Sequence, residues 1–200
     1  MNRDKIELKP TVVFARWISW IGHPLVFISL SVGIIISLRL ANRAGLALSL
    51  TLFATVILPM ALLLFRGFRT GRWSDPDVSN RAERVRFYPP AISISTVAVI
   101  VLLLLRAPAF ALRGAAVTLF LLMMAALINF RMKLSLHALF AFYSAIILFV
   151  VNPIAGAAAF MLALLVFWSR LYLKRHDLSE MLVGAVLGLL GGLVTSWKPG

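Results

Sequence analysis

Charged residues divide the chain into six long stretches that contain no Asp, Glu, Lys or Arg. A helix needs roughly 20 residues to cross a hydrocarbon core of about 30 Å, and five stretches have about that length. The sixth, residues 134–169, is too long for one ordinary crossing, and Asn152 and Pro153 lie near its middle. Because proline breaks helical hydrogen bonding, we divide this stretch in two. The pattern predicts seven helices, over residues 17–38, 44–65, 87–105, 114–130, 134–151, 153–169 and 178–197.

Composition indicates that lipid is the solvent for these helices. Hydrophobic residues make up 62% of the chain and charged residues 14%, against about 45–50% and about 25% in soluble domains. Backbone groups in a bilayer must be satisfied internally, so helices are expected rather than open strands. We therefore predict an all-α, polytopic transmembrane helical bundle with about seven spans, six to seven. Residues 1–200 form a single membrane domain with a polar loop over residues 66–88.

The N-terminal residues and the cysteine content add two limits. The segment MNRDKIELKP lacks the features of a signal peptide, so we expect the first hydrophobic segment to be retained. There is no cysteine, which rules out disulfides and thiolate metal sites and leaves the redox compartment open. The prediction is an integral, multi-pass protein of a bacterial or archaeal cell membrane.

Counting crossings assigns every connection to one of two faces. One face receives the N-terminus and residues 66–88, 131–136 and 170–180. Of the 20 Lys and Arg residues, 15 lie on that face. Cytoplasmic loops are enriched in Lys and Arg, so this bias favours a cytoplasmic position for the face. A basic phosphate site would carry similar charge in either orientation.

The net charge of +13 is what basic flanks of membrane spans produce when they contact anionic headgroups. In a soluble protein the same charge would suggest nucleic acid. No basic and aromatic motif for RNA or DNA is present, however. We therefore expect membrane lipids, and no nucleic acid, as partners.

The segment SRLYLKRHDLSE, residues 169–180, holds the first candidate for chemistry. If the last helix begins near His176, that residue and Glu180 lie one turn apart on the same face. A carboxylate there accepts a hydrogen bond from one imidazole nitrogen and makes the other a better nucleophile. Arg170 offers a planar fork of donors suited to phosphate oxygens. The alternative is a basic membrane-edge junction in which the His and Glu are incidental.

The segment MKLSLHALF places Lys133, Ser135 and His137 at the start of the fifth helix, on the same predicted face as His176. A hydroxyl and an imidazole two residues apart are suited to donating to a phosphate and to protonating a leaving oxygen. A lone histidine at a membrane edge is more often an interfacial residue, which is the alternative here.

The polar loop supplies the third candidate, three arginines just before the third helix: Arg81, Arg84 and Arg86. They either flank the helix as positive charge, or one or two of them clamp the same phosphate that Arg170 contacts. Three acidic residues share the loop: Asp75, Asp77 and Glu83. These acids either pair with the arginines or hold a divalent ion. We favour pairing, because arginines outnumber acids in this loop.

Taken in chain order, the polar loop, the segment MKLSLHALF and the segment SRLYLKRHDLSE resemble the three motifs of the type 2 phosphatidic acid phosphatase superfamily. The pattern of that superfamily is K-x6-R-P, then P-S-G-H, then S-R-x5-H-x3-D. The third motif keeps every spacing, with Glu in place of Asp: Ser169, Arg170, His176 and Glu180. The second keeps Ser135 and His137, with leucine at the proline and glycine positions.

The first motif departs furthest from the pattern of the superfamily. Arg81 takes the place of the lysine and Arg84 or Arg86 that of the arginine, while Tyr88 precedes Pro89. The resemblance covers residues 81–180, about half of the chain, and indicates a divergent branch of the superfamily.

The resemblance implies a metal-independent phosphatase that needs no cofactor. His176 attacks the phosphoryl group in line while Glu180 orients it. His137 protonates the leaving group and then activates the water that hydrolyses the phosphohistidine. The phosphate-binding residues implied by the resemblance, together with the neighbouring basic residues, are Arg170, Arg81, Arg84, Ser135, Lys133 and Arg86. A site at the membrane edge favours a lipid phosphate or a polyprenyl diphosphate as the substrate.

Several alternatives remain open. The altered first and second motifs fit a catalytically silent membrane protein of the same superfamily. A membrane transporter would place polar residues near the midplane, whereas these helices are nearly free of charge. A prenyl-transferring enzyme would need paired aspartate clusters for magnesium, and the sequence offers none beyond Asp75 and Asp77.

Gly184 and Gly188 have a spacing that permits close helix contact. We expect packing inside the bundle and leave the oligomeric state open.

Overall fold

The computed structural model describes residues 9–197, with the side chain of Asn42 left aside. Within that range the chain is helical and contains no strand. Its elements are α1 (Pro10–Ile21), α2 (Pro24–Arg39), α3 (Asn42–Leu52), the π-helical segment η1 (Phe53–Ile57), α4 (Leu58–Arg69), α5 (Arg81–Leu104), α6 (Ala109–Ile128), α7 (Leu136–Val151), α8 (Pro153–Tyr172) and α9 (Leu178–Ser196).

Five helices are long and apolar enough to cross a membrane: the continuous helix formed by α3, η1 and α4, and then α5, α6, α8 and α9. The number rises to six if α1 and α2 are counted as one bent span. Large apolar side chains such as Leu104 and Ile154 are exposed on the outside of the bundle. This is expected where lipid covers the surface. The predicted all-α membrane architecture is confirmed at this level, and the chain is consistent with an integral membrane protein.

The helix predicted over residues 17–38 is broken in the structure. α1 ends at Ile21, and α2 begins at Pro24, whose missing N–H is harmless in the first turn of a helix. His23 caps α2, because its Nδ1 accepts a hydrogen bond from the backbone N–H of Leu25 at 3.3 Å. The two helices are bent by 54° relative to each other. The break places His23 at the junction between them.

The loop between α4 and α5 is shorter than the predicted 66–88, because both flanking helices extend into it. It covers residues 70–80. α5 begins early, since the side chain of Asn80 accepts a hydrogen bond from the backbone N–H of Ala82 at 2.9 Å and satisfies one donor of the first turn. η1 lies just before Pro59, which has no N–H to donate. A locally wider turn accommodates that missing bond.

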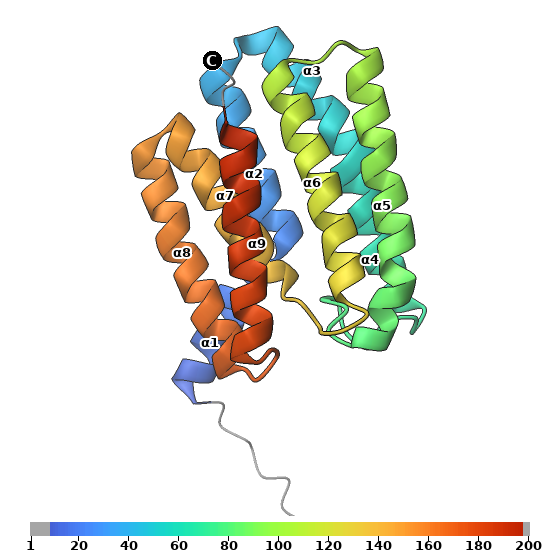
Figure 1. Ribbon diagram of the computed structural model, residues 1–200, viewed down its shortest axis with the longest axis vertical. Coiled ribbons are helices and arrows are strands. Elements are labelled where there is room, and N and C mark those ends of the chain that lie inside the picture. The colour runs from blue at the N-terminus through green and yellow to red at the C-terminus, as the bar shows by residue number, and fades with distance from the viewer. Residues whose placement is uncertain (1–8, 198–200) are drawn as a thin grey trace, which may run out of the picture.

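The stretch 134–169 divides at the predicted position. Asn152 separates α7 from α8, and its Oδ1 accepts a hydrogen bond from the backbone N–H of Ala155 at 3.0 Å. α7 has only 16 residues, but it packs against α2, α8 and α9 and most of it is buried. Protein rather than lipid therefore surrounds this short helix, which runs antiparallel to α8 (Figure 1).

Two glycines of α9 allow close contact with α7. A Cβ atom added at Gly184 would lie 2.6 Å from the carbonyl oxygen of Ser135, and one added at Gly188 would clash with the carbonyl of Leu139. Neither position has room for a side-chain carbon atom. The glycine spacing in α9 therefore serves packing inside the bundle. It also fixes the height of α9 against the start of α7, where candidate site residues lie.

Three connections lie at the same end of the bundle, the lower end in Figure 1: residues 70–80, 129–135 and 173–177. The α5–α6 and α7–α8 connections lie at the opposite end, near the end of α9. The segments that carry the candidate chemistry thus meet at one end of the helices.

We expect Gly188→Ala to lower the melting temperature in detergent, because overpacking a close helix contact costs about 1–3 kcal/mol. Gly33→Ala is the matched control, since nothing lies within 4 Å of a Cβ atom added at that helical glycine. Thermal unfolding followed by circular dichroism measures both. An equal effect of the two substitutions would contradict the close α7–α9 contact.

Candidate active site

His176 and Glu180 form a hydrogen-bonded pair at the start of α9. Nδ1 of His176 lies 2.7 Å from Oε2 of Glu180. The pair forms because Asp177 caps the helix, accepting a hydrogen bond from the backbone N–H of Glu180 at 2.8 Å. Nε2 of His176 is buried and has no hydrogen-bond partner within residues 9–197. The carboxylate therefore accepts the Nδ1 proton and leaves a lone pair on Nε2.

The environment of His176 keeps its imidazole neutral. Burial of the ring, reinforced by the positive charges of Arg84, Arg170 and Lys133, lowers the pKa of His176 to about 2. A neutral imidazole with one nitrogen held by a carboxylate is the form that acts as a nucleophile. The three cations that depress this pKa also make the site favourable for an anion.

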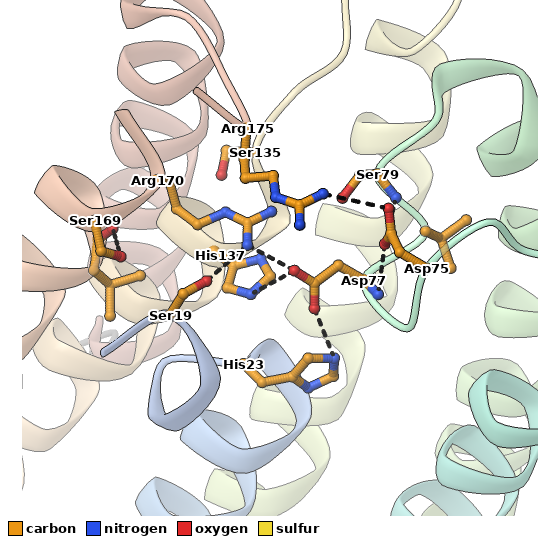
Figure 2. Close-up of polar contacts among 12 residues, drawn as sticks. Ser19, His23, Asp75, Asp77, Ser79, Ser135, His137, Ser169, Arg170 and Arg175 are labelled. Carbon is orange, nitrogen blue, oxygen red and sulfur yellow. Dashed lines mark hydrogen bonds and ion pairs between the residues drawn. The ribbon is translucent and has the colours of Figure 1, made fainter. Parts of the chain in front are cut away.

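Arg170 supplies two donors that have no partner in the described part of the chain. Its side chain is almost completely buried, with 1% exposed. Nη1 donates to Oγ of Ser19 at 2.7 Å and to Oδ2 of Asp77 at 2.6 Å (Figure 2). Nε and Nη2 are buried and unpaired. These two nitrogens share one edge of the planar guanidinium, so Arg170 presents a two-donor edge suited to an oxyanion.

Ser135 and His137 come from the first turn of α7. Oγ of Ser135 caps the helix by accepting a hydrogen bond from the backbone N–H of Ala138 at 3.4 Å. No hydrogen bond among the described residues uses the hydroxyl of Ser135 as a donor. Nε2 of His137 is buried without a hydrogen bond and lies 3.9 Å from Oδ2 of Asp77. Both side chains are thus free to donate to, or accept from, a bound group.

Two hydrogen bonds to backbone carbonyls join the segment before α7 to the first turn of α9 and to the connection that precedes it. The backbone N–H of Ser135 donates to the carbonyl of Glu180 at 3.2 Å. Nζ of Lys133 donates to the carbonyl of Arg175 at 2.8 Å and lies 3.8 Å from Oε2 of Glu180. Burial lowers the pKa of Lys133, an effect that the Glu180 carboxylate opposes. Lys133 therefore lies beside the His176–Glu180 pair.

Of the three loop arginines, only Arg84 joins the cluster. It is 1% exposed, and its Nε donates to the carbonyl of Val78 at 2.9 Å while Nη1 donates to the carbonyl of Leu134. Arg81 and Arg86 are exposed. Arg81 donates instead to the carbonyls of Asn129, at 2.8 Å, and Phe130. The structure thus does not bring Arg81 and Arg86 into the phosphate site that the resemblance implies.

Sequence reasoning missed two residues of the cluster, Ser19 and His23, and it expected Asp77 to pair with an arginine of its own loop rather than with Arg170. His23 lies 3.9 Å from Oδ1 of Asp77, and its ring meets that of His137 edge to face with centroids 5.7 Å apart (Figure 2). The break at Gly22 and Pro24 was the available signal, because a histidine beside a helix-breaking proline marks a capped junction.

The loop acids are paired, but with other partners than the ones predicted. Asp77 pairs with Arg170, and Asp75 lies 3.8 Å from Arg175. The carboxylate of Glu83 accepts hydrogen bonds from Ser74. Among residues 9–197 no group of three His, Asp or Glu side chains is arranged to hold a metal ion.

These residues together could transfer a phosphoryl group. A nucleophilic nitrogen, a two-donor arginine edge and a second imidazole are buried at the same end of the bundle, where the charge of Arg170 acts on His176. Phosphoryl transfer depends mainly on positioning and on neutralising the charge of the equatorial oxygens. The cluster offers donors for those oxygens and a group able to move a proton.

We expect His176 to remain neutral as the pH falls from 8 to 5, through the ordinary histidine value of 6.5, because its pKa lies near 2. Nitrogen-15 NMR of histidine-labelled protein, with the resonance assigned from His176→Asn, measures the charge state directly. The chemical shifts should be those of a neutral ring protonated on Nδ1. A titration midpoint near 6.5 would contradict the environment described here.

Comparisons with protein-family models, with curated proteins and with solved structures found no match to this chain.

Proposed function

We propose that the chain is a membrane lipid phosphatase that hydrolyses a phosphomonoester or diphosphate of a lipid or polyprenol through a phosphohistidine intermediate. One observation carries the proposal. His176 is buried and neutral, with Nδ1 held by Glu180 and Nε2 unpaired, in the same cluster as the unpaired Nε–Nη2 edge of Arg170. A nucleophile and an oxyanion-binding edge in one buried region are the minimum that phosphoryl transfer to a histidine needs.

The first chemical step forms a bond from Nε2 of His176 to phosphorus and breaks the bond from phosphorus to the leaving oxygen. Arg170, with Arg84, Lys133 and Ser135, neutralises the phosphoryl oxygens. His137, protonated while the anionic substrate is bound, gives its proton to the leaving oxygen. The Nδ1 proton of His176 stays hydrogen-bonded to Glu180, which stabilises the positive charge that develops on the ring.

The second step returns the enzyme to its starting state. His137, now neutral, removes a proton from a water molecule, and the hydroxide oxygen bonds to phosphorus. The bond from phosphorus to Nε2 breaks, and inorganic phosphate leaves. The protons balance, because His137 gives one proton in the first step and takes one in the second.

A lipid substrate is supported by where the cluster lies. The polar residues sit at one end of apolar helices, so a headgroup phosphate would reach them from the membrane surface. An apolar groove of about 260 Å³ lies between α2, α7 and α8, and Ile21, two residues before His23, is one of the residues that line it. The groove offers space for a hydrocarbon chain that runs from Ile21, at the site end of the bundle, toward Leu148 and Ala155 near the opposite end. We also propose that the chain crosses the membrane six or seven times, with the short, protein-covered α7 as the seventh crossing. The excess of Lys and Arg on the face that carries the site favours a cytoplasmic position for the site.

A catalytically silent member of the same superfamily is the second candidate, favoured by one observation. Arg81 and Arg86, which correspond to basic positions of the first motif, are exposed, and Arg81 is bonded to the backbone of residues 129 and 130. The phosphate would then be bound by fewer arginines than the resemblance implies. The experiments below separate the two candidates.

We expect His176→Ala to abolish phosphate release from a panel of lipid phosphates and polyprenyl diphosphates in detergent, by at least about 1,000-fold, because it removes the nucleophile. Malachite green detection of phosphate measures the rate, and turnover should persist with a chelator. Acid-labile labelling of the wild-type protein from a phosphorus-32 substrate should be absent from the variant.

Lys174→Gln is the control for that substitution, because Lys174 is exposed in the same loop. It should keep the wild-type turnover. Equal phosphate release from the wild-type protein and His176→Ala would contradict the proposal, as would a wild-type protein inactive on the whole panel.

We expect His137→Ala to slow the first step according to the leaving group. With an alkyl phosphate the loss should be about 100- to 10,000-fold, the usual contribution of a general acid. With a nitrophenyl phosphate the loss should be much smaller, since nitrophenolate leaves without a proton. Single-turnover release of the leaving group isolates this step. Equal losses for both substrates would contradict the role of His137 as the acid.

A further inference from the structure

Asp77 occupies a central place in the cluster that the chemical steps above do not use. Its Oδ2 lies 2.6 Å from Nη1 of Arg170 and 3.9 Å from Nε2 of His137. Its Oδ1 lies 3.9 Å from Nε2 of His23. Figure 2 shows the carboxylate between the guanidinium and the two imidazoles. One side chain of the 70–80 loop thus faces three site residues, from α8, α7 and the junction between α1 and α2.

Asp77 accepts a hydrogen bond from Nη1 of Arg170, whereas an oxyanion that binds the guanidinium side-on contacts Nε and Nη2. Arg170 donates through Nη1 to both Asp77 and Ser19, while Nε and Nη2, which form the opposite edge, are buried and unpaired. An arginine side chain has several rotatable bonds, so two acceptors on one nitrogen fix the plane of the guanidinium and the direction of its remaining edge.

Asp77 is itself fixed by the loop that carries it. Its backbone N–H donates to Oδ1 of Asp75 at 2.9 Å, and the same oxygen accepts from the N–H of Ser79 at 3.2 Å. The next residue, Val78, has a φ of +48°, which a β-branched residue rarely adopts. Its carbonyl accepts the hydrogen bond from Arg84. A strained residue held by a buried arginine marks a position that the surrounding structure determines strongly.

His23 completes this arrangement from the break between α1 and α2. Its Nδ1 accepts the capping hydrogen bond from Leu25, so in the neutral ring the proton is on Nε2, which faces Asp77. The helix break thus places a donor 3.9 Å from the second oxygen of the carboxylate, which is a charge contact rather than a hydrogen bond. Ser19, from the end of α1, is the other acceptor on Nη1 of Arg170.

We infer that Asp77 is a positioning residue, which holds Nη1 of Arg170 together with Ser19 so that the Nε–Nη2 edge is free to bind the phosphate of the substrate. The inference rests on the proposed function. The carboxylate does not touch the reacting atoms in this arrangement. It acts through Arg170.

Orthovanadate binding tests the inference without requiring turnover. Vanadate has the charge and shape of phosphate, and vanadium-51 NMR line broadening with the full-length protein in detergent gives its dissociation constant. Asp77→Ala should weaken vanadate binding about 10-fold or more, the effect of losing a hydrogen bond to a charged group. Asp77→Asn, which keeps an oxygen acceptor of the same shape, should restore most of that affinity.

Glu83→Gln is the charge-matched control, because it removes an acid whose hydrogen bonds go to Ser74 outside the cluster. It should leave the dissociation constant unchanged. If Asp77→Ala is not folded, Ser19→Ala removes only the second acceptor on Nη1 and should weaken vanadate binding by a smaller factor. Unchanged binding in Ser19→Ala would then overturn the inference.

Two other outcomes overturn the inference in different ways. Tighter vanadate binding by Asp77→Ala would show that the carboxylate competes with the anion rather than positioning its receptor. Equal vanadate binding by the wild-type protein and Asp77→Ala would show that the phosphate site does not depend on Asp77. Absence of vanadate binding by the wild-type protein would contradict the proposed function itself.

Discussion

The buried guanidinium of Arg170 is the constraint on which this end of the molecule depends. A charge removed from water is costly unless it is paired and hydrogen-bonded. The side chain is 1% exposed, and its partners come from outside α8, from Asp77 of the 70–80 loop and Ser19 of α1. α1 therefore packs against the end of α8, and the loop enters the bundle instead of remaining at its surface.

Features set by neighbouring residues could be predicted from the sequence. The one-turn spacing of His176 and Glu180 is sufficient to form their hydrogen bond once a helix begins at Asp177. The division at Asn152 follows from a capping side chain directly before a proline. The all-helical membrane architecture follows from charge-free stretches of bilayer length. The first two depend on residues within about five positions of one another and the third on the composition of one continuous stretch of roughly 20 residues, so capping rules and hydropathy are enough.

Features set by distant residues could not be predicted in the same way. Nothing local distinguishes Arg84, whose side chain turns into the bundle, from Arg81, which bonds the α6–α7 connection, because the direction depends on which carbonyls lie nearby. The partner of Asp77 is 93 residues away. His23 was overlooked because a neutral histidine does not interrupt a stretch that is defined by the absence of Asp, Glu, Lys and Arg. Its role depends on a bend whose consequences only the packed structure shows.

The distances along the chain between these residues also determine when the cluster can form. A chain made from its N-terminus releases Ser19 first, then Asp77, and Arg170 more than ninety residues later. Until α8 is in place, the acceptors on α1 and the loop have no guanidinium to bind. The polar cluster therefore forms only when the final helices have been inserted, so its completion coincides with assembly of the whole bundle.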